Sequence, residues 1–201
     1  MLRYAKEFLG QRLILFLLAV IFLSGYGTAV TFGNVWTAAA ILAGAVFIII
    51  VEYTVHRYIL HEYPRIVPIA YKGHVAHHQD PTNVKFLFGP VSVDMGSYVI
   101  ILLAALLLTG YNWHLSLSAV FGASLFQMYY QWKHYISHRP IVPLTPWGKW
   151  MKKRHLLHHY MDEKTWYGVS NPLLDMVLHT DGSDGSAGGK KNASEATSDR
   201  N

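Results

Sequence analysis

Residues 13–51 read LILFLLAVIFLSGYGTAVTFGNVWTAAAILAGAVFIIIV, a run of 39 residues without Asp, Glu, Lys or Arg. One helix of this length would extend about 58 Å, roughly twice the thickness of the hydrocarbon core of a bilayer. The Gly-Tyr-Gly-Thr stretch at 25–28 and the Gly-Asn pair at 33–34 interrupt the run. The run therefore predicts a hairpin of two membrane helices.

A second uncharged run, of 38 residues, covers 95–132 and is interrupted by Thr-Gly-Tyr-Asn at 109–112. Only 14% of all residues are charged, against about 25% in a soluble domain. We therefore predict an all-α integral membrane protein with four transmembrane helices in two hairpins, at about 12–30, 35–60, 93–109 and 113–138. A soluble all-α domain is the alternative, but uncharged runs of this length are hard to keep in water.

The basic residues all lie outside the two hairpin tips, so with two hairpins they share one face of the membrane. The positive-inside rule makes that face, and both termini, cytoplasmic, in a bacterial inner membrane or the endoplasmic reticulum. Anionic lipid headgroups account for the net charge of +5, so no nucleic-acid partner is expected. We expect one membrane domain over 1–180, with a cytoplasmic helical cap at 139–180. The polar tail 181–201 is too poor in apolar residues to fold.

Ten of the twelve histidines fall in four clusters on the predicted cytoplasmic side. The pentapeptides His-Val-Ala-His-His (74–78) and His-Leu-Leu-His-His (155–159) share the spacing His-x-x-His-His, which places three imidazoles on one helix face. The other two clusters close the second and fourth predicted helices. The ten are His56, His61, His74, His77, His78, His134, His138, His155, His158 and His159.

The pair His56 and His61 does not fit a helix face. Five residues correspond to about 500° of α-helix, so the two side chains diverge by roughly 140°. Either the helix ends between them, or they serve different metals.

Crowded imidazoles repel one another when protonated, whereas neutral imidazole is a common metal ligand. We therefore predict a dimetal site in which each metal takes about five histidines. Nitrogen ligation suits iron, zinc, copper or nickel, and the absence of Cys excludes thiolate ligands. His114, near the opposite end of the fourth helix, and the isolated His179 are left out of the site.

Four further residues are candidates to support the ligands. Glu52, one turn before His56, could accept a hydrogen bond from a ligand imidazole and fix its tautomer, or pair with Arg57. Gln131 belongs to a polar stripe that faces the bundle interior. Tyr160 and Asp162 follow the last cluster, where they could equally be solvated. No substrate-binding residue is predicted.

The clusters, with their spacings His-x4-His, His-x2-His-His, His-x3-His and His-x2-His-His, resemble the fatty acid hydroxylase / sterol desaturase superfamily of integral-membrane histidine-box oxygenases. Residues 55–61 (VHRYILH), 154–160 (RHLLHHY) and 167–173 (YGVSNPL) look most like the fatty acid 2-hydroxylase branch. The likeness covers about 45–180. His179 departs from it, because similar proteins tend to carry a small residue there.

The resemblance implies that the ten histidines ligate two metal ions, with iron expected in the working enzyme and zinc possible in a purified sample. It implies an O2-dependent lipid hydroxylase that oxidises an acyl chain near its headgroup. The chain has no Gly-x-Gly-x-x-Gly motif, so electrons are expected from a separate reductase, ferredoxin or cytochrome b5. A desaturase, or a sterol or carotenoid hydroxylase, stays open, and a membrane haem protein, a metal transporter and a zinc hydrolase are weaker alternatives.

Overall fold

Every secondary-structure element is a helix in the part of the chain that the computed structural model describes, residues 2–31 and 35–183. The long helices are α2 (Arg12–Val30), α3 (Thr37–Thr54), α6 (Val91–Leu108) and α7 (Trp113–Ser137). The short helices are α1 (Leu2–Leu9), α4 (Pro68–Gln79), α5 (Val84–Leu87), α8 (Pro146–Tyr160) and α9 (Leu173–Val177). The α3 helix continues directly into a π-helix, η1 (Val55–Glu62). The predicted all-α class is confirmed, and the predicted helices agree with these bounds to within a few residues.

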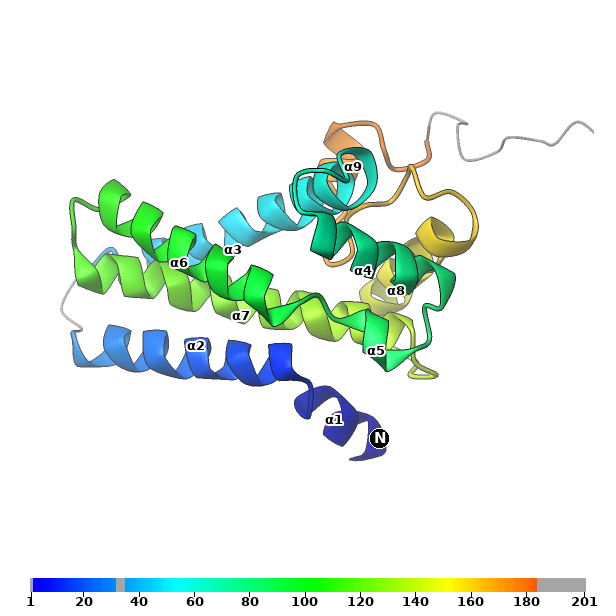
Figure 1. Ribbon diagram of the computed structural model, residues 1–201. Coiled ribbons are helices and arrows are strands. Elements are labelled where there is room, and N and C mark those ends of the chain that lie inside the picture. The colour runs from blue at the N-terminus through cyan, green and yellow to red at the C-terminus, as the bar shows by residue number, and fades with distance from the viewer. Residues whose placement is uncertain (1, 32–34, 184–201) are drawn as a thin grey trace, which may run out of the picture.

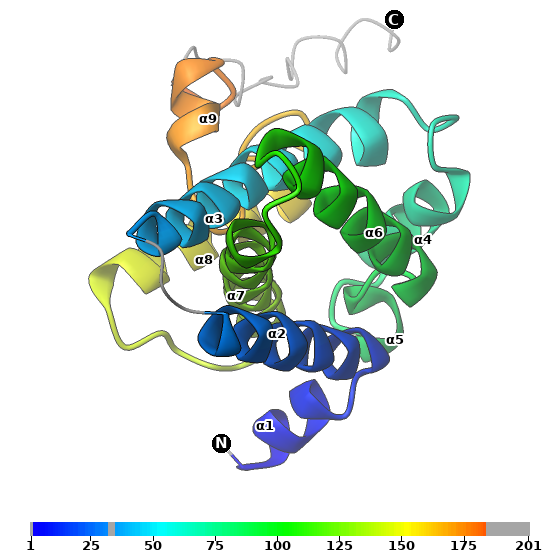
Figure 2. The same ribbon diagram turned by 90° about the vertical axis from the view of Figure 1, so that its left-hand side faces the viewer.

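The four long helices lie side by side, and the short helices α4, α5, α8 and α9 gather at one end of them (Figure 1). The turn between α6 and α7 and the facing ends of α2 and α3 lie at the opposite end. The chain thus forms two helical hairpins whose open ends meet a helical cap. The end-on view in Figure 2 places α7 among α2, α3 and α6.

Three segments of the described residues are long and apolar enough to cross a membrane, namely Arg12–Val30, Thr37–Glu62 and Val84–Leu108. The helix α7, where the fourth span was predicted, does not share this property. It carries buried polar side chains along its length, among them Ser116, Ser124 and Gln131. Because α7 is the helix that the other three surround, its polar groups face protein instead of lipid.

The helices α3 and α7 approach each other backbone to backbone at two glycines. A Cβ atom added to Gly44 would lie 1.9 Å from the carbonyl oxygen of Ala119, and one added to Gly122 would lie 1.9 Å from that of Ile41. Small residues that allow such close contact are typical of packed membrane helices. The contact fixes α7 relative to α3, and both helices lead into the cap.

The first three residues of the predicted polar tail contact the cap or one another. The carbonyl oxygen of Asp181 accepts a hydrogen bond of 2.7 Å from the indole nitrogen of Trp166, and the carboxylate of Asp181 accepts from the backbone of Ser183 at 3.1 Å. Residues 181–183 are therefore bound to the cap. The rest of the predicted tail, 184–201, lies outside the described residues.

Candidate metal centre

Four segments carry the ten predicted histidines into the cap. They are η1, α4, the C-terminal end of α7 and α8. Proline occupies the first position of both α4 and α8, where its missing N–H costs nothing. Thr145 caps α8 by accepting a hydrogen bond of 3.0 Å from the backbone of Gly148. These local signals start both helices a few residues before their His-x-x-His-His motifs.

The ten side chains divide into two groups of five, and within each group the candidate ligand atoms all lie within 4.8 Å of one another. Site A comprises His56, His61, His74, His78 and His158. Site B comprises His77, His134, His138, His155 and His159.

Each His-x-x-His-His motif is shared between the two sites. In the first motif, the i, i+4 pair His74 and His78 belongs to site A, while His77 belongs to site B. In the second motif the i, i+4 pair belongs to site B, and the middle histidine, His158, belongs to site A. The two motifs therefore cross, and neither site can form from one motif alone.

His56 and His61 both belong to site A. The helix does not end between them, since η1 continues through Val55–Glu62. The grouping of the two side chains argues against the second alternative, different metals. The reason is the π-helix, in which i→i+5 hydrogen bonds bring residues five apart onto one face. The angle calculated for an ordinary α-helix could not predict that His56 and His61 share one face.

The imidazole Nε2 atoms converge within each site. In site A, the Nε2 of His74 lies 2.9 Å from that of His61 and 3.1 Å from that of His78. In site B, the corresponding distances are 3.0 Å between His77 and His134 and 2.8 Å between His138 and His155. Nitrogens bound at about 2.1 Å and at right angles around one metal would be about 3.0 Å apart.

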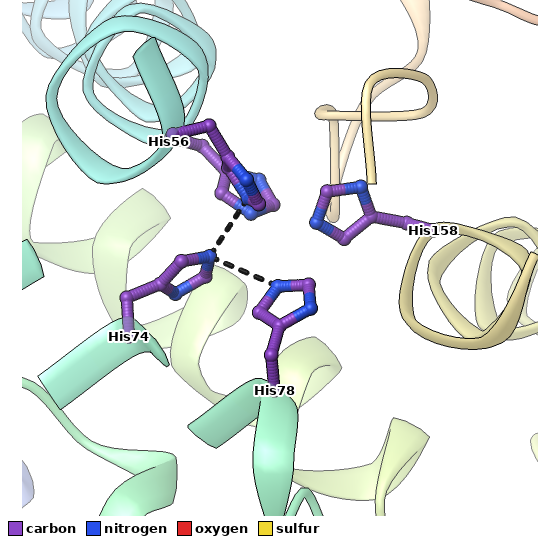
Figure 3. A group of neighbouring side chains, drawn as sticks. His56, His74, His78 and His158 are labelled. Atoms are coloured by element: carbon purple, nitrogen blue, oxygen red, sulfur yellow. Dashed lines mark hydrogen bonds between the residues drawn. The ribbon is translucent and has the colours of Figure 1, made fainter. Parts of the chain in front are cut away.

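Figure 3 shows four rings of site A, those of His56, His74, His78 and His158, directed at a common space. The Nε2 atoms of His56 and His158 are buried and have no hydrogen-bond partner within the described chain. A buried nitrogen without a partner is costly, and a metal ion would satisfy both. The residues of site A therefore fit a metal.

Burial also favours the chemical form that binds metals. It lowers the pKa of His78 to about 4, and it holds the pKa values of His74, His155 and His158 well below their usual range. These imidazoles are neutral at neutral pH, with a lone pair available to a cation.

Comparison with known proteins gives a match that includes the whole cap. The family model described as fatty acid hydroxylase matches residues 40–180. The chain belongs to the fatty acid hydroxylase family. The predicted resemblance is therefore confirmed, and the family match contains both sites.

Among the curated relatives is the ceramide very long chain fatty acid hydroxylase scs7 of Schizosaccharomyces pombe. It is 30% identical over an alignment of 146 residues that covers 66% of this chain and 39% of the relative. The dihydroceramide fatty acyl 2-hydroxylase FAH2 of Arabidopsis thaliana is 29% identical over 65% of this chain and 55% of its own length. The match thus spans about two fifths to just over half of these relatives.

A solved structure of full-length scs7p, in which only the hydroxylase domain is visible, has the same fold. Its TM-score is 0.70 at 21% identity, covering 83% of this chain and 64% of that one.

In this member of the fatty acid hydroxylase family, a loop of the cap contacts site A from outside. The Nδ1 of His56 lies 2.6 Å from the carbonyl oxygen of Tyr167, and the Nδ1 of His158 lies 2.8 Å from that of Thr165. The Oε1 of Glu163 lies 3.4 Å from the Nδ1 of His78. The two carbonyl contacts come from backbone atoms, for which no sequence signal exists.

Of the four supporting candidates, Glu52 takes neither of the two roles considered for it, and the two beside the last cluster agree with the solvated alternative. Glu52 accepts from the backbone of residues 169 and 170 instead of from an imidazole, and Arg57 pairs with Glu62. Tyr160 is 69% exposed. Asp162 accepts from the backbone of Lys164 at 3.0 Å, so it stabilises a turn.

The fourth candidate, Gln131, is buried and lines a cavity of about 260 Å³ beside both sites. His56 and His74 of site A and His77 and His134 of site B contribute to its wall. Away from the histidines, the wall is mainly apolar and reaches Ile48 of α3 and Ile101 of α6. A polar pair interrupts it, in which Gln127 donates to Asp94 at 2.5 Å.

The remaining histidines lie outside both sites, as predicted. His114 is buried near the start of α7, where its ring nitrogens lie 2.8 Å from the hydroxyl of Thr31 and 2.7 Å from that of Thr37. His179 is exposed and has a φ of 54°, in the left-handed region that favours glycine. A small residue would suit that position, in agreement with the departure noted from the sequence.

Proposed function

We propose that the chain is a membrane-bound, O2-dependent dimetal oxygenase that hydroxylates a lipid acyl chain near its headgroup. The observation that carries the proposal is the division of ten buried or half-buried histidines into two sites of five. The relatives are named as ceramide and fatty acyl hydroxylases, and their reaction type comes to this chain as part of the proposal.

Sites A and B would each hold one metal ion through imidazole nitrogens. Iron is the proposed working metal, and zinc would bind the same ligands. When bound, a pair of iron ions would supply the activation of O2 that no amino-acid side chain provides. The protein holds the ions, orients the imidazoles and buries the site away from water.

The cavity is the proposed path of the acyl chain. Its apolar wall lies between α3 and α6, two of the segments apolar enough to cross a membrane. Its other end touches histidines of both sites. An acyl chain that entered from the bilayer would bring a carbon near its headgroup beside the histidines, which favours oxidation at that position.

Hydroxylation of a C–H bond by O2 also forms water and consumes two electrons and two protons. We propose that a separate reductase, ferredoxin or cytochrome b5 supplies the electrons. We further propose four membrane spans, with α7 as the fourth, one membrane domain over 1–180, and a cytoplasmic cap and termini, on the basis of the basic residues around the cap.

The test combines lipid mass spectrometry of cells that express the chain with metal analysis of the purified protein. The proposal expects acyl chains that gain one oxygen, a gain that His158→Ala abolishes, and two metal ions per chain. Loss of two hydrogens without added oxygen would identify a desaturase. A well-folded sample with fewer than two metals per chain would contradict the dimetal centre.

A further inference from the structure

Two buried carboxylates hold one loop of the cap from two sides. Asp175 of α9 accepts hydrogen bonds from the backbone N–H groups of residues 167 and 168, both at 2.9 Å. Glu52 of α3 accepts from the backbone N–H groups of residues 169 and 170, at 2.7 and 2.8 Å. Four successive N–H groups of the loop 167–170 therefore end on two side chains.

Each carboxylate is itself fixed. Asp175 is fully buried, and it also accepts from the hydroxyl of Thr180 at 2.8 Å and from the guanidinium of Arg154 at 3.4 Å. Glu52 is buried and accepts from the hydroxyl of Ser170 as well. The loop cannot shift without breaking several buried hydrogen bonds, which are costly to leave unmade.

The loop is also closely packed at Gly168. A Cβ atom there would lie 2.1 Å from the carbonyl oxygen of Asn171 and 2.9 Å from Oδ2 of Asp175. The absence of a side chain lets the backbone lie directly against the carboxylate. One conformation of the loop is therefore selected.

This loop and the residues just before it orient two rings of site A. The carbonyl of Tyr167 is 2.6 Å from the Nδ1 of His56, and the carbonyl of Thr165 is 2.8 Å from the Nδ1 of His158. A carbonyl only accepts, so each Nδ1 must carry the proton and each Nε2 lone pair is left to face site A.

Within the described residues, four of the five rings of site B lack such support. The Nδ1 atoms of four of its members are buried without a hydrogen-bond partner in the described part of the chain, namely His77, His138, His155 and His159. The hydrogen bonds of the loop therefore distinguish the two sites.

We propose that Glu52 and Asp175 are positioning residues for the metal of site A. They fix the loop 167–170, which contacts His56 through Tyr167, and with it the preceding Thr165, which contacts His158. The inference rests on the proposed function, in that site A must hold a metal. If the two carboxylates merely stabilised the cap, their loss would weaken both sites alike, so the two metals must be measured separately.

The experiment uses the full chain purified in detergent, loaded with Zn²⁺ and titrated with a chelator. Asp175→Asn replaces an acceptor oxygen with an amide group that faces the loop's own N–H donors. We expect one of two bound zinc ions to be released at about 10–100-fold lower chelator concentration, as for other residues that orient metal-ligating histidines. The second zinc should be retained as in the wild type.

Co²⁺ spectra assign the weakened ion. His61→Ala removes a ligand of site A, and His138→Ala removes a ligand of site B. The absorption band lost first from Asp175→Asn should match the band missing from His61→Ala. The band missing from His138→Ala should be retained.

Glu52→Gln changes the other carboxylate and should weaken the same ion. Ser170→Ala removes only the hydroxyl contact to Glu52, so a smaller effect on that ion remains measurable if the carboxylate variants do not fold. The control is Glu7→Gln, because Glu7 accepts from Tyr135 at 2.7 Å and from Arg139 at 2.6 Å and contacts neither site. It should lower stability and leave both zinc affinities unchanged.

Equal weakening of both ions, weakening of the site B ion, or unchanged affinity in these variants would overturn the positioning role. A wild-type chain that binds fewer than two metals would instead contradict the proposed function.

Discussion

The Nε2 atoms of His138 and His155 lie 2.8 Å apart, although one residue ends α7 and the other lies within α8. Two imidazoles come this close without strain when both lone pairs point to one cation. We therefore expect His155→Ala to remove the metal of site B and leave that of site A. Metal analysis should show about one ion per chain, and lipid hydroxylation should be lost.

The matched control for this variant is His179→Ala, since His179 is exposed and belongs to neither site. It should keep both ions and full activity. If His155→Ala retained two ions, or if His179→Ala lost one, the division of the histidines into sites A and B would be incorrect.

The sequence predicted the ligand candidates because their chemistry and their i, i+3 and i+4 spacings are local. It could not divide them between two sites. That division depends on the crossing of α4 and α8 and on the π-helix that brings His61 beside His56. The sequence also could not predict the hydrogen bonds of Glu52, because its partners are backbone atoms more than a hundred residues away, at Val169 and Ser170.

The close contact of α3 and α7 predicts a large effect of one added methyl group. In Gly122→Ala, the new Cβ would lie 1.9 Å from the carbonyl oxygen of Ile41, so the helices must separate. We expect the free energy of unfolding to fall by about 1–3 kcal/mol, as for other overpacked interiors. The thermal midpoint of the detergent-solubilised protein measures it.

Gly96→Ala in α6 serves as the comparison. A Cβ atom there meets nothing within 4 Å, and alanine favours a helix over glycine by about 1 kcal/mol. This variant should be as stable as the wild type or more so. Equal losses in both glycine variants would argue against the backbone contact.

Lys152 stabilises the end of the helix that carries two site B histidines. Its ammonium donates to the carbonyl oxygens of Ile136, Arg139 and Ile141 at 2.8, 2.7 and 3.0 Å. Lys152→Met removes all three hydrogen bonds, although the carbonyl oxygens of Ile136 and Arg139 each keep a backbone donor, and should cost about 1–3 kcal/mol. Thermal unfolding measures the loss, and Lys153→Met, which changes an exposed neighbour, should show almost none.

The buried imidazoles make the metal-free chain sensitive to acid. Burial lowers the pKa of His78 to about 4, whereas an unfolded histidine titrates near about 6.5. Between these values the unfolded chain binds more protons than the folded chain, so the stability rises with pH and falls on acidification. Each such histidine contributes about 1.4 kcal/mol per pH unit within its window.

We therefore expect the thermal midpoint of the metal-free protein to fall steadily as the pH drops from about 6.5 toward 4. His78→Gln should make this dependence shallower, because glutamine does not titrate. A midpoint that rose on acidification, or a slope unchanged in His78→Gln, would argue against a neutral, buried imidazole at position 78.

If the cavity holds the acyl chain, a substitution in its wall should change the preference for chain length without releasing the metals. Ile101 of α6 lines the apolar part of the cavity, so Ile101→Trp should shorten the space that a chain can fill. We expect hydroxylation of long chains to fall at least about tenfold relative to short chains, while both metals remain bound. A methylene in an apolar pocket is worth about 1–3 kcal/mol, so losing room for one or two of them accounts for this ratio.

Leu103→Trp, on the same helix but 55% exposed, is the matched control and should leave the chain-length profile unchanged. If Ile101→Trp lowered the hydroxylation of all chain lengths equally, the acyl chain would have to bind outside this cavity.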